Sequence, residues 1–309
     1  MNNIASVKDR LKNKADSSGK TMMELLTAYG LERTVYRLSV SRFANNFTLK
    51  GAIFLYALFG GEYARATTDI DLEARLIGND PEGMRAVFEE IFSIEADDPL
   101  RFDLGTLEVK RITEFKEYPG INVSVMAFLD RTRIPVSIDI GFDDVIYPGR
   151  VHMDFPVVLS EVPPRIYAYS LSSCIAEKFE AIVSLAYDNS RLKDFYDLYV
   201  IACSRDIDGA ELLGAMKETF THRNVRSDVI AAFEPDFTED PIRRTRWTSF
   251  VKKKRAMLPV TFEETIGMIR TFIVPILDAM KNGVAFDKVW RHENREWESI
   301  GSDAINSVD

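Results

Sequence analysis

The residues whose types and spacing most clearly suggest a chemical role are three acids in the stretch DIDLE, from Asp69 to Glu73, which alternate with apolar residues. In a β-strand, residues two positions apart lie on the same face, so the three carboxylates would share one face of the strand while Ile70 and Leu72 face a core. Carboxylates gathered in this way repel one another unless a cation lies among them. Because Mg²⁺ binds one or two carboxylates together with substrate phosphates, we expect Asp69 and Asp71 to hold Mg²⁺, with Glu73 as the outer, solvated end of that face. The alternative is the solvated face of an edge strand.

A further acid lies among apolar neighbours in the segment PVSIDIGFDD. On a strand, Ser137, Asp139 and Gly141 share one face. If this strand lies beside the first one, Asp139 adds a third carboxylate to the predicted Mg²⁺ site. Three carboxylates around Mg²⁺, next to a turn that binds phosphate, are the layout of nucleotidyl transfer.

The phosphate-binding turn is predicted where the strand-like FTLK meets Gly51 and the apolar helix AIFLYALFG. A helix N-terminus presents unpaired N–H groups and partial positive charge, and a glycine lets a ligand approach the backbone closely. Lys50 would add a point charge at this turn. Taken alone the pattern is weak, because many strand-to-helix turns use glycine only for packing.

A second group of charged residues lies in the later stretch EKFEAIVSLAYDNSRLKDFYDLY. Lys178 lies on a helix with an apolar side, and Asp194 and Asp197 share a helix face with Arg191 one turn earlier. One interpretation is a surface ion-pair network that contributes little to stability. The other is that Lys178 and Arg191 neutralise triphosphate charge and that the aspartates orient them. The sequence alone favours neither interpretation clearly over the other.

The elements that would position these residues change in character along the chain. Helical spacing over residues 20–44 and 81–96 alternates with strand candidates at 47–50, 69–73, 107–115, 121–130 and 135–143. We therefore predict an α+β core over residues 1–162, with a mixed sheet and N-terminal helices. Pro163-Pro164 is typical of a linker, and the segments after it predict a helical C-terminal domain over residues 163–309.

Composition narrows the class of protein. With 46% hydrophobic and 28% charged residues, the chain of 309 residues has the composition of a folded protein. Its two cysteines and three isolated histidines form neither a disulfide framework nor a zinc motif. The N-terminus lacks the apolar core of a signal peptide, and the longest apolar stretches, such as 52–59, are too short to span a bilayer. We expect a cytoplasmic protein without a membrane partner.

The net charge of −9 argues against a general nucleic-acid coat but allows a local basic surface. The segment 243–255, RRTRWTSFVKKKR, carries seven Lys and Arg residues and no acid. It is either a helix that packs Trp247, Phe250 and Val251 inward, or part of an RNA-binding surface; the two interpretations are compatible.

Six segments in this order resemble the AbiEii/AbiGii nucleotidyltransferase toxins, which include the MenT-type toxins: LERTVYRLSVS, FTLKGAIFLYAL, RATTDIDL, VSIDIGFDD, EKFEAIV and NSRLKDFYDLY. The resemblance runs from about residue 20 to 200, and more loosely through RRTRWTSFVKK. It implies a nucleotidyltransferase-fold core, a helical C-terminal domain and a cognate antitoxin. Some members of the family add nucleotides to the 3′ end of tRNA.

Carried onto this chain, the family's first motif falls on Gly51 and the Asp69/Asp71 pair. The lysine of the second motif falls on Lys178, and the third motif falls on Asp194 and Asp197. Many members carry Ser or Gly directly after the glycine, where this chain has Ala52. Alanine removes a hydroxyl group but keeps the backbone N–H.

We therefore predict a Mg²⁺-dependent toxin that transfers a nucleoside monophosphate from an NTP to RNA, with tRNA as the expected acceptor. The expected catalytic residues are Asp69, Asp71, Asp139, Lys178 and Asp194, and the expected nucleotide-binding residues are Lys50, Gly51, Ala52, Arg65, Lys178, Arg191 and Asp197. Two alternatives remain. In the first, the same reaction has a protein hydroxyl or a small molecule as its acceptor, since a fold does not fix its substrate. In the second, the chain binds a nucleotide or a partner without turnover.

Overall fold

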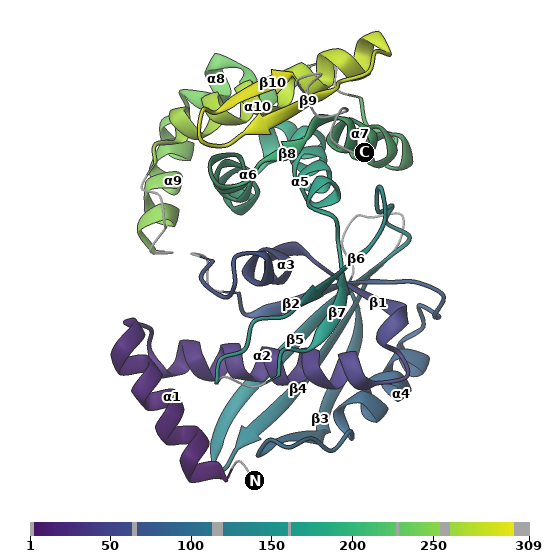
Figure 1. Ribbon diagram of the computed structural model, residues 1–309, viewed down its shortest axis with the longest axis vertical. Coiled ribbons are helices and arrows are strands. Elements are labelled where there is room, and N and C mark those ends of the chain that lie inside the picture. Colours follow the sequence, from purple (N-terminus) through teal and green to yellow (C-terminus); the bar gives the residue numbers. More distant parts are fainter. Residues whose placement is uncertain are drawn as a thin grey trace, which may run out of the picture. The chain divides into compact units, whose positions relative to one another are not determined.

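The computed structural model describes residues 3–63, 67–112, 120–159, 162–226, 229–253 and 260–299. The chain divides into two compact units (Figure 1). The first comprises Met1–Asp144 and Arg150–Tyr169, and the second comprises Val145–Gly149 and Ser170–Asp309. The chain therefore enters the second unit briefly at 145–149 before it returns to complete the first.

The described part of the first unit is built on a mixed sheet of seven strands, in the order β3-β4-β5-β2-β1-β7-β6. Strand β2 pairs in parallel with β5 and antiparallel with β1, so it lies inside the sheet. The edge-strand interpretation of the DIDLE stretch is therefore wrong. The strands are β1 Phe47–Lys50, β2 Asp69–Ala74, β3 Leu100–Ile112, β4 Gly120–Leu129, β5 Thr132–Phe142, β6 Val151–Asp154 and β7 Arg165–Ala168.

Three of the four described helices of the first unit, α1, α2 and α4, begin at residues whose side chains cap them. Thr21 and Glu24 form a capping box before α2, and Asp80 caps α4, which begins at Pro81. The helices predicted over residues 20–44 and 81–96 are thus α2 and α4, with somewhat shorter bounds. The helices are α1 Ile4–Ser18, α2 Met22–Val40, α3 Gly51–Leu58 and α4 Pro81–Phe92.

One face of the sheet is covered and the other carries the polar residues. Figure 1 shows α2 lying across the sheet, and a Cβ added to Gly30 of this helix would lie 2.7 Å from Ile134 Cγ2 of β5. The residues of β5 on this face, among them Ile138 and Ile140, are buried, whereas Ser137 and Asp139 alternate with them and stay half-buried. The alternation predicted for β5 therefore places its polar residues on the opposite face.

A buried ionic cluster fixes α2 to the segment before β3. The Asp98 carboxylate is fully buried and accepts hydrogen bonds from Arg33 Nε at 2.8 Å and Arg37 Nη1 at 3.0 Å. Glu32, also buried, accepts a hydrogen bond from the backbone N–H of Val158 at 2.6 Å. Buried charges persist only when they are paired in this way, so the cluster fixes the position of α2 within the unit.

The second unit is largely helical, but it also contains a small sheet that the sequence analysis did not predict. Trp290 on β9 is fully buried and donates a hydrogen bond from Nε1 to the Ala202 carbonyl at 2.7 Å. The described elements are α5 Leu171–Leu185, α6 Leu192–Ser204, α7 Gly209–His222, α8 Pro235–Thr238, α9 Pro241–Lys253 and α10 Phe262–Asn282, with a sheet in the order β10-β9-β8 from Glu296–Ser299, Lys288–Arg291 and Ile207–Asp208.

The short segment 145–149 is part of the second unit through Tyr147. The Ser173 hydroxyl accepts a hydrogen bond from Tyr147 N–H at 2.8 Å and donates one to the Tyr147 carbonyl at 3.0 Å. The Tyr147 ring packs so closely on α7 that a Cβ added to Gly214 would lie 2.3 Å from Cε1 of the ring. Gly214 is therefore required by this contact.

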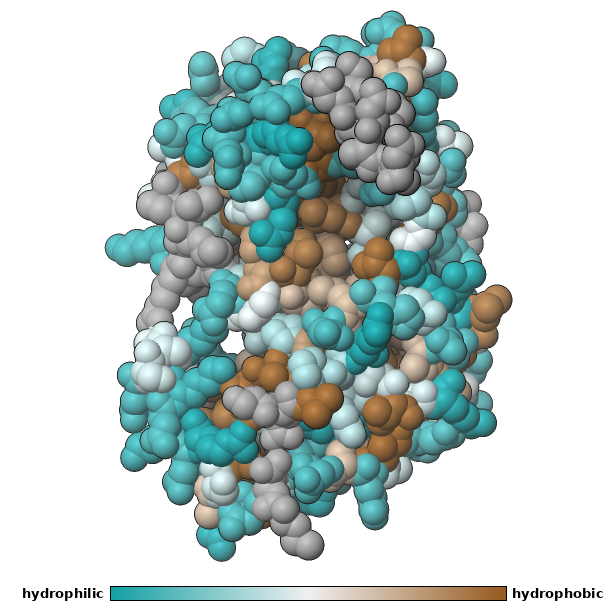
Figure 2. All heavy atoms as spheres, viewed as in Figure 1, coloured by the Kyte–Doolittle hydropathy of each residue, from teal (hydrophilic) through white to brown (hydrophobic). Residues whose placement is uncertain are grey.

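None of the described helices is long and apolar enough to cross a membrane. Figure 2 shows mainly hydrophilic residues on the visible surface, with apolar residues interspersed among them.

Candidate functional site

The acids predicted on two separate strands lie side by side in the first unit. In the register of β2 and β5, Asp71 is opposite Asp139, and Asp69 is opposite Ser137. Neighbouring strands lie about 4.8 Å apart, so the two opposing carboxylates begin at adjacent backbone positions on the same face. Asp71 and Asp139 are half-buried and Asp69 is exposed.

The turn before α3 is built around the carboxylate of Asp71. Gly51 has a φ of +63°, and a Cβ placed there would lie 2.2 Å from Asp71 Oδ2. The same Oδ2 accepts a hydrogen bond from the Ala52 backbone N–H at 3.2 Å. Glycine is thus required by both the backbone conformation and the close approach of the acid, and the first N–H groups of α3 point toward the acidic face.

Asp139 is held by a residue that the sequence analysis did not identify. Asn122 on β4 is opposite Asp139, and its Nδ2 donates hydrogen bonds to Asp139 Oδ1 at 2.7 Å and to Ser137 Oγ at 3.0 Å. The only signal in the sequence is that Asn122 and Ser124 are polar residues among the apolar residues of this strand. The partner of Asn122 becomes evident only from the strand register.

Asp69 lies at the first position of β2, where its Oδ2 accepts a hydrogen bond from the Thr68 hydroxyl at 3.0 Å. It is the most exposed of the three acids and lines a hollow on the β5 side of β2. Arg65, predicted to bind nucleotide, lies outside the described residues.

Glu73 is not the solvated end of the acidic face, as expected, but is buried, with 3% of its surface exposed. Lys50 Nζ lies 2.9 Å from Glu73 Oε2 and 2.5 Å from Asp144 Oδ2. Burial raises the pKa of Glu73 to about 7, although Lys50 opposes the rise. Gly141, opposite Glu73 on β5, leaves room for this pair, since a Cβ there would lie 2.8 Å from Glu73 Oε2. Lys50 is thus engaged with two carboxylates, and its contact with phosphate stays a prediction.

The acidic face fits a magnesium ion that arrives with a nucleotide better than a preformed cage of protein ligands. Among the described residues, no group of three or more acids, histidines or cysteines is arranged to hold a metal. Mg²⁺, however, is usually bound by one or two carboxylates and completes its shell with substrate phosphates and water. The opposing Asp71 and Asp139, with Asp69 two residues along β2, supply hard oxygen ligands of this kind.

The charged group of the second unit is a buried network and not a surface one. Lys178 Nζ lies 2.6 Å from Asp197 Oδ2 and 3.2 Å from Asp194 Oδ1, and these three residues are between 0% and 8% exposed. Arg191 Nε lies 2.7 Å from Asp194 Oδ2, but 43% of the Arg191 side chain is exposed. The surface interpretation is therefore wrong for three of the four residues, and Arg191 is the cation of the group that solvent reaches.

The structure therefore brings the predicted residues together as two separate groups. Asp69, Asp71 and Asp139 meet beside the Gly51–Ala52 turn in the first unit, and Lys178, Arg191, Asp194 and Asp197 meet in the second.

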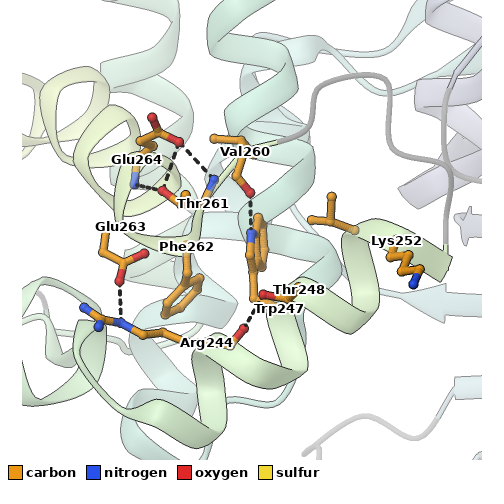
Figure 3. A pocket seen from close by; sticks show the side chains of 10 residues that line it. Arg244, Trp247, Thr248, Lys252, Val260, Thr261, Phe262, Glu263 and Glu264 are labelled. Atoms are coloured by element: carbon orange, nitrogen blue, oxygen red, sulfur yellow. Dashed lines mark hydrogen bonds and ion pairs between the residues drawn. The ribbon is translucent and has the colours of Figure 1, made fainter.

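Helix α9 carries the basic segment, and of the three residues predicted to pack inward Trp247 is buried, whereas Phe250 and Val251 are half-buried. Trp247 is 1% exposed and donates a hydrogen bond from Nε1 to the Val260 carbonyl at 2.8 Å (Figure 3). Arg244 pairs with Glu263 beside a hollow of about 670 Å³ within the second unit. Arg246 and Lys252 are exposed, whereas Lys254 and Arg255 lie outside the described residues. Part of the basic segment is thus structural, and part of it is exposed.

Comparisons with known proteins agree with the family that the motifs indicate. A family model described as "Nucleotidyl transferase AbiEii toxin, Type IV TA system" matches residues 33–267. A search of curated proteins finds no match.

Solved structures also match the chain over most of its length. MenT4, a nucleotidyltransferase toxin from Mycobacterium tuberculosis H37Rv, is 15% identical with a TM-score of 0.48, over 90% of this chain and 99% of that chain. JHP933 from Helicobacter pylori is 15% identical with a TM-score of 0.45, over 82% of this chain and 91% of that chain.

Proposed function

The chain belongs to the AbiEii family of nucleotidyl transferase toxins of type IV toxin–antitoxin systems, and on this premise we propose that it transfers a nucleoside monophosphate from an NTP to the 3′ end of a tRNA in a Mg²⁺-dependent reaction. Membership of the family makes the chain a nucleotidyltransferase that uses an NTP and has a cognate antitoxin. The acceptor, the metal and the roles of individual residues are the content of the proposal.

The observation that carries the proposal is the position of Asp71. Its carboxylate lies opposite Asp139 and also contacts the N-terminal turn of α3 at Ala52 N–H. A helix N-terminus favours bound phosphate through its free N–H groups and its partial positive charge. A triphosphate at the Gly51–Ala52 turn would therefore have the Asp71/Asp139 pair at its side.

In the proposed reaction the acceptor hydroxyl oxygen attacks the α-phosphorus, the bond to the β-phosphate breaks, and pyrophosphate leaves. Asp69, Asp71 and Asp139 would hold Mg²⁺, which supplies charge neutralisation and a lowered pKa for the acceptor hydroxyl. Asn122 would keep the Asp139 carboxylate in position through its 2.7 Å hydrogen bond. Ala52 contributes its backbone N–H only, so its lack of a hydroxyl is compatible with this role.

In the second unit, the exposure of each cation suggests its role. We assign the contact with the triphosphate chiefly to Arg191, whose side chain solvent reaches. Lys178 is buried against Asp194 and Asp197, and it would act on the nucleotide mainly by holding Asp194, which in turn orients Arg191. Lys178, Asp194 and Asp197 are then positioning residues.

A tRNA acceptor requires a local basic surface, because the whole chain has a net charge of −9. The exposed Arg246 and Lys252 on α9 are candidates for part of that surface. Since phosphate contacts release counterions, the apparent affinity for tRNA should fall steeply as the salt concentration rises.

Label transfer tests the proposal directly. The purified protein is incubated with Mg²⁺, each α-labelled NTP in turn and total tRNA, beside Asp71→Asn and the control Asp154→Asn, an exposed acid on β6 of the same sheet. We expect labelled tRNA with the wild type and with Asp154→Asn, and none with Asp71→Asn or after periodate oxidation of the tRNA 3′ end. Label on protein, or no label on any acceptor, would refute the proposal and favour a protein acceptor or binding without turnover.

A further inference from the structure

A hollow of about 550 Å³ opens beside the acidic face within the first unit. Its walls come from α2, the start of β2, β3, β4 and β5, and they include Asp69, Ser124, Met126, Phe128, Arg133 and Ser137. A volume of this size is typical of sites for small ligands, and it is sufficient for one nucleoside.

The hollow is joined to the acids by direct contacts. Asp69 belongs to its wall, and Ser137, the register partner of Asp69, belongs to it as well. Ser137 shares the Asn122 amide with Asp139. A group bound in the hollow would therefore lie next to Asp69 and would be separated from Asp139 by Ser137 and Asn122.

The order of strands places the hollow and the predicted phosphate-binding turn on opposite sides of β2. The turn at Gly51 and Ala52 follows β1, on one side of β2, whereas the hollow lies over β5 and β4, on the other side. In phosphoryl transfer the attacking and the leaving oxygens lie roughly in line through the phosphorus. If pyrophosphate leaves at the turn, the attacking hydroxyl comes from the side of the hollow.

We propose that this hollow binds the 3′-terminal nucleoside of an RNA acceptor, an inference that rests on the proposed function. Its lining has the three kinds of group that a terminal nucleotide needs. Met126 and the Phe128 ring give an apolar wall on which a base can stack, and the Arg101 guanidinium lies over that ring at 5.0 Å from its centroid. Arg133 is an exposed cation for the adjoining phosphate, and the Ser124 and Ser137 hydroxyls can bond to the ribose.

Kinetics with separate substrates test this assignment. We compare Phe128→Ala with Phe128→Tyr, which keeps the ring, and Arg133→Gln with Arg165→Gln, an exposed arginine on β7 of the same unit. The readouts are KM for the RNA acceptor, KM for the NTP, and the thermal midpoint of each variant. Because one base–aromatic contact is worth a factor of about 5 to 150 in affinity, we expect Phe128→Ala to raise the acceptor KM roughly ten-fold or more. We expect a smaller rise for Arg133→Gln and an unchanged KM for the NTP in both variants. Phe128→Tyr keeps the ring and should raise the acceptor KM less than Phe128→Ala does, whereas Arg165→Gln should change neither KM.

A second measurement uses the unmodified protein and so does not depend on the folding of a variant. An RNA whose last nucleotide is 4-thiouridine is photocrosslinked to the wild type, and the attached peptide is identified by mass spectrometry. Crosslinks within β3, β4 or β5, the strands that form most of the lining, support the proposal. Labelled RNA with an unchanged acceptor KM in Phe128→Ala, or crosslinks confined to other elements, would overturn it while leaving the proposed function intact. A wild type that labels no RNA would instead refute the proposed function.

Discussion

Gly51 provides the sharpest test of the site, because adding one methyl group there should disable the enzyme through Asp71. At Gly51 an alanine Cβ would lie 2.2 Å from Asp71 Oδ2. Non-bonded contacts of carbon lie at about 3.5–4.0 Å, so the carboxylate would have to retreat by roughly 1 Å or more. It would then also lose its hydrogen bond from Ala52 N–H.

Gly60 is a matched control within the same unit. It has the same φ of +63°, but nothing lies within 4 Å of a Cβ placed there. Left-handed backbone costs a non-glycine residue about 1–2 kcal/mol. In a unit of this size that corresponds to a fall in the thermal midpoint of roughly 2–8 °C. Gly51→Ala and Gly60→Ala should share this loss of stability.

Activity should separate the two variants. A misplacement of about 1 Å in a reacting group can lower a rate about 100-fold, so we expect Gly51→Ala to lose about that factor in kcat, measured by single-turnover label transfer. Gly60→Ala should keep a rate close to that of the wild type at a temperature where both variants are folded. If Gly51→Ala transferred nucleotide as fast as Gly60→Ala, the position of the Asp71 carboxylate would not matter for the reaction, and our assignment of the site would be wrong.

Three further predictions concern Asp139, Lys178 and Glu73. Asp139→Asn should abolish label transfer while the thermal midpoint stays unchanged or rises, since it relieves repulsion with Asp71; a collapsed midpoint would mean that the acid is structural. Lys178→Ala should lower the free energy of unfolding by about 3–5 kcal/mol in denaturant titrations, because it leaves buried carboxylates unpaired. The double variant Lys178→Ala/Asp197→Asn should recover part of that loss. A Lys178→Ala variant as stable as the wild type would show that Lys178 does not stabilise the buried carboxylates. The raised pKa of Glu73, about 7, means that its protonated form favours folding. Relative to Glu73→Gln, the wild type should therefore lose stability as the pH rises from about 4.5 to about 7, and a difference in midpoint that does not change with pH would refute this.

The strands that carry the acids could be predicted from the sequence, because an alternation of polar and apolar residues specifies which side chains share a face. The sequence also predicted the helices α2 and α4, from a helical spacing of apolar residues that is a local property of the chain. It could not supply the strand order. That Asp139 lies opposite Asp71, and that Asn122 holds it, depends on pairings between residues far apart in the chain.

The predictions that were wrong have the same cause. Glu73 has the pattern of a solvated acid, but Lys50 and Asp144 cover it from other elements. Lys178 and Asp197 lie on different helices, so nothing local indicates that they meet and are buried. The small sheet of the second unit has strands of only two to four residues, too short for a period to be recognised.

The excursion of residues 145–149 into the second unit has a genetic consequence. A break between 144 and 145 would deprive the first unit of β6 and β7, and a break between 169 and 170 would deprive the second unit of Tyr147 and its contact with Gly214. No single cut in the reading frame yields both units complete. Gene fission, or a split reporter built from this protein, would need a duplicated or transplanted segment, and on the ribosome the second unit cannot complete the packing around Tyr147 until α7 has been synthesised.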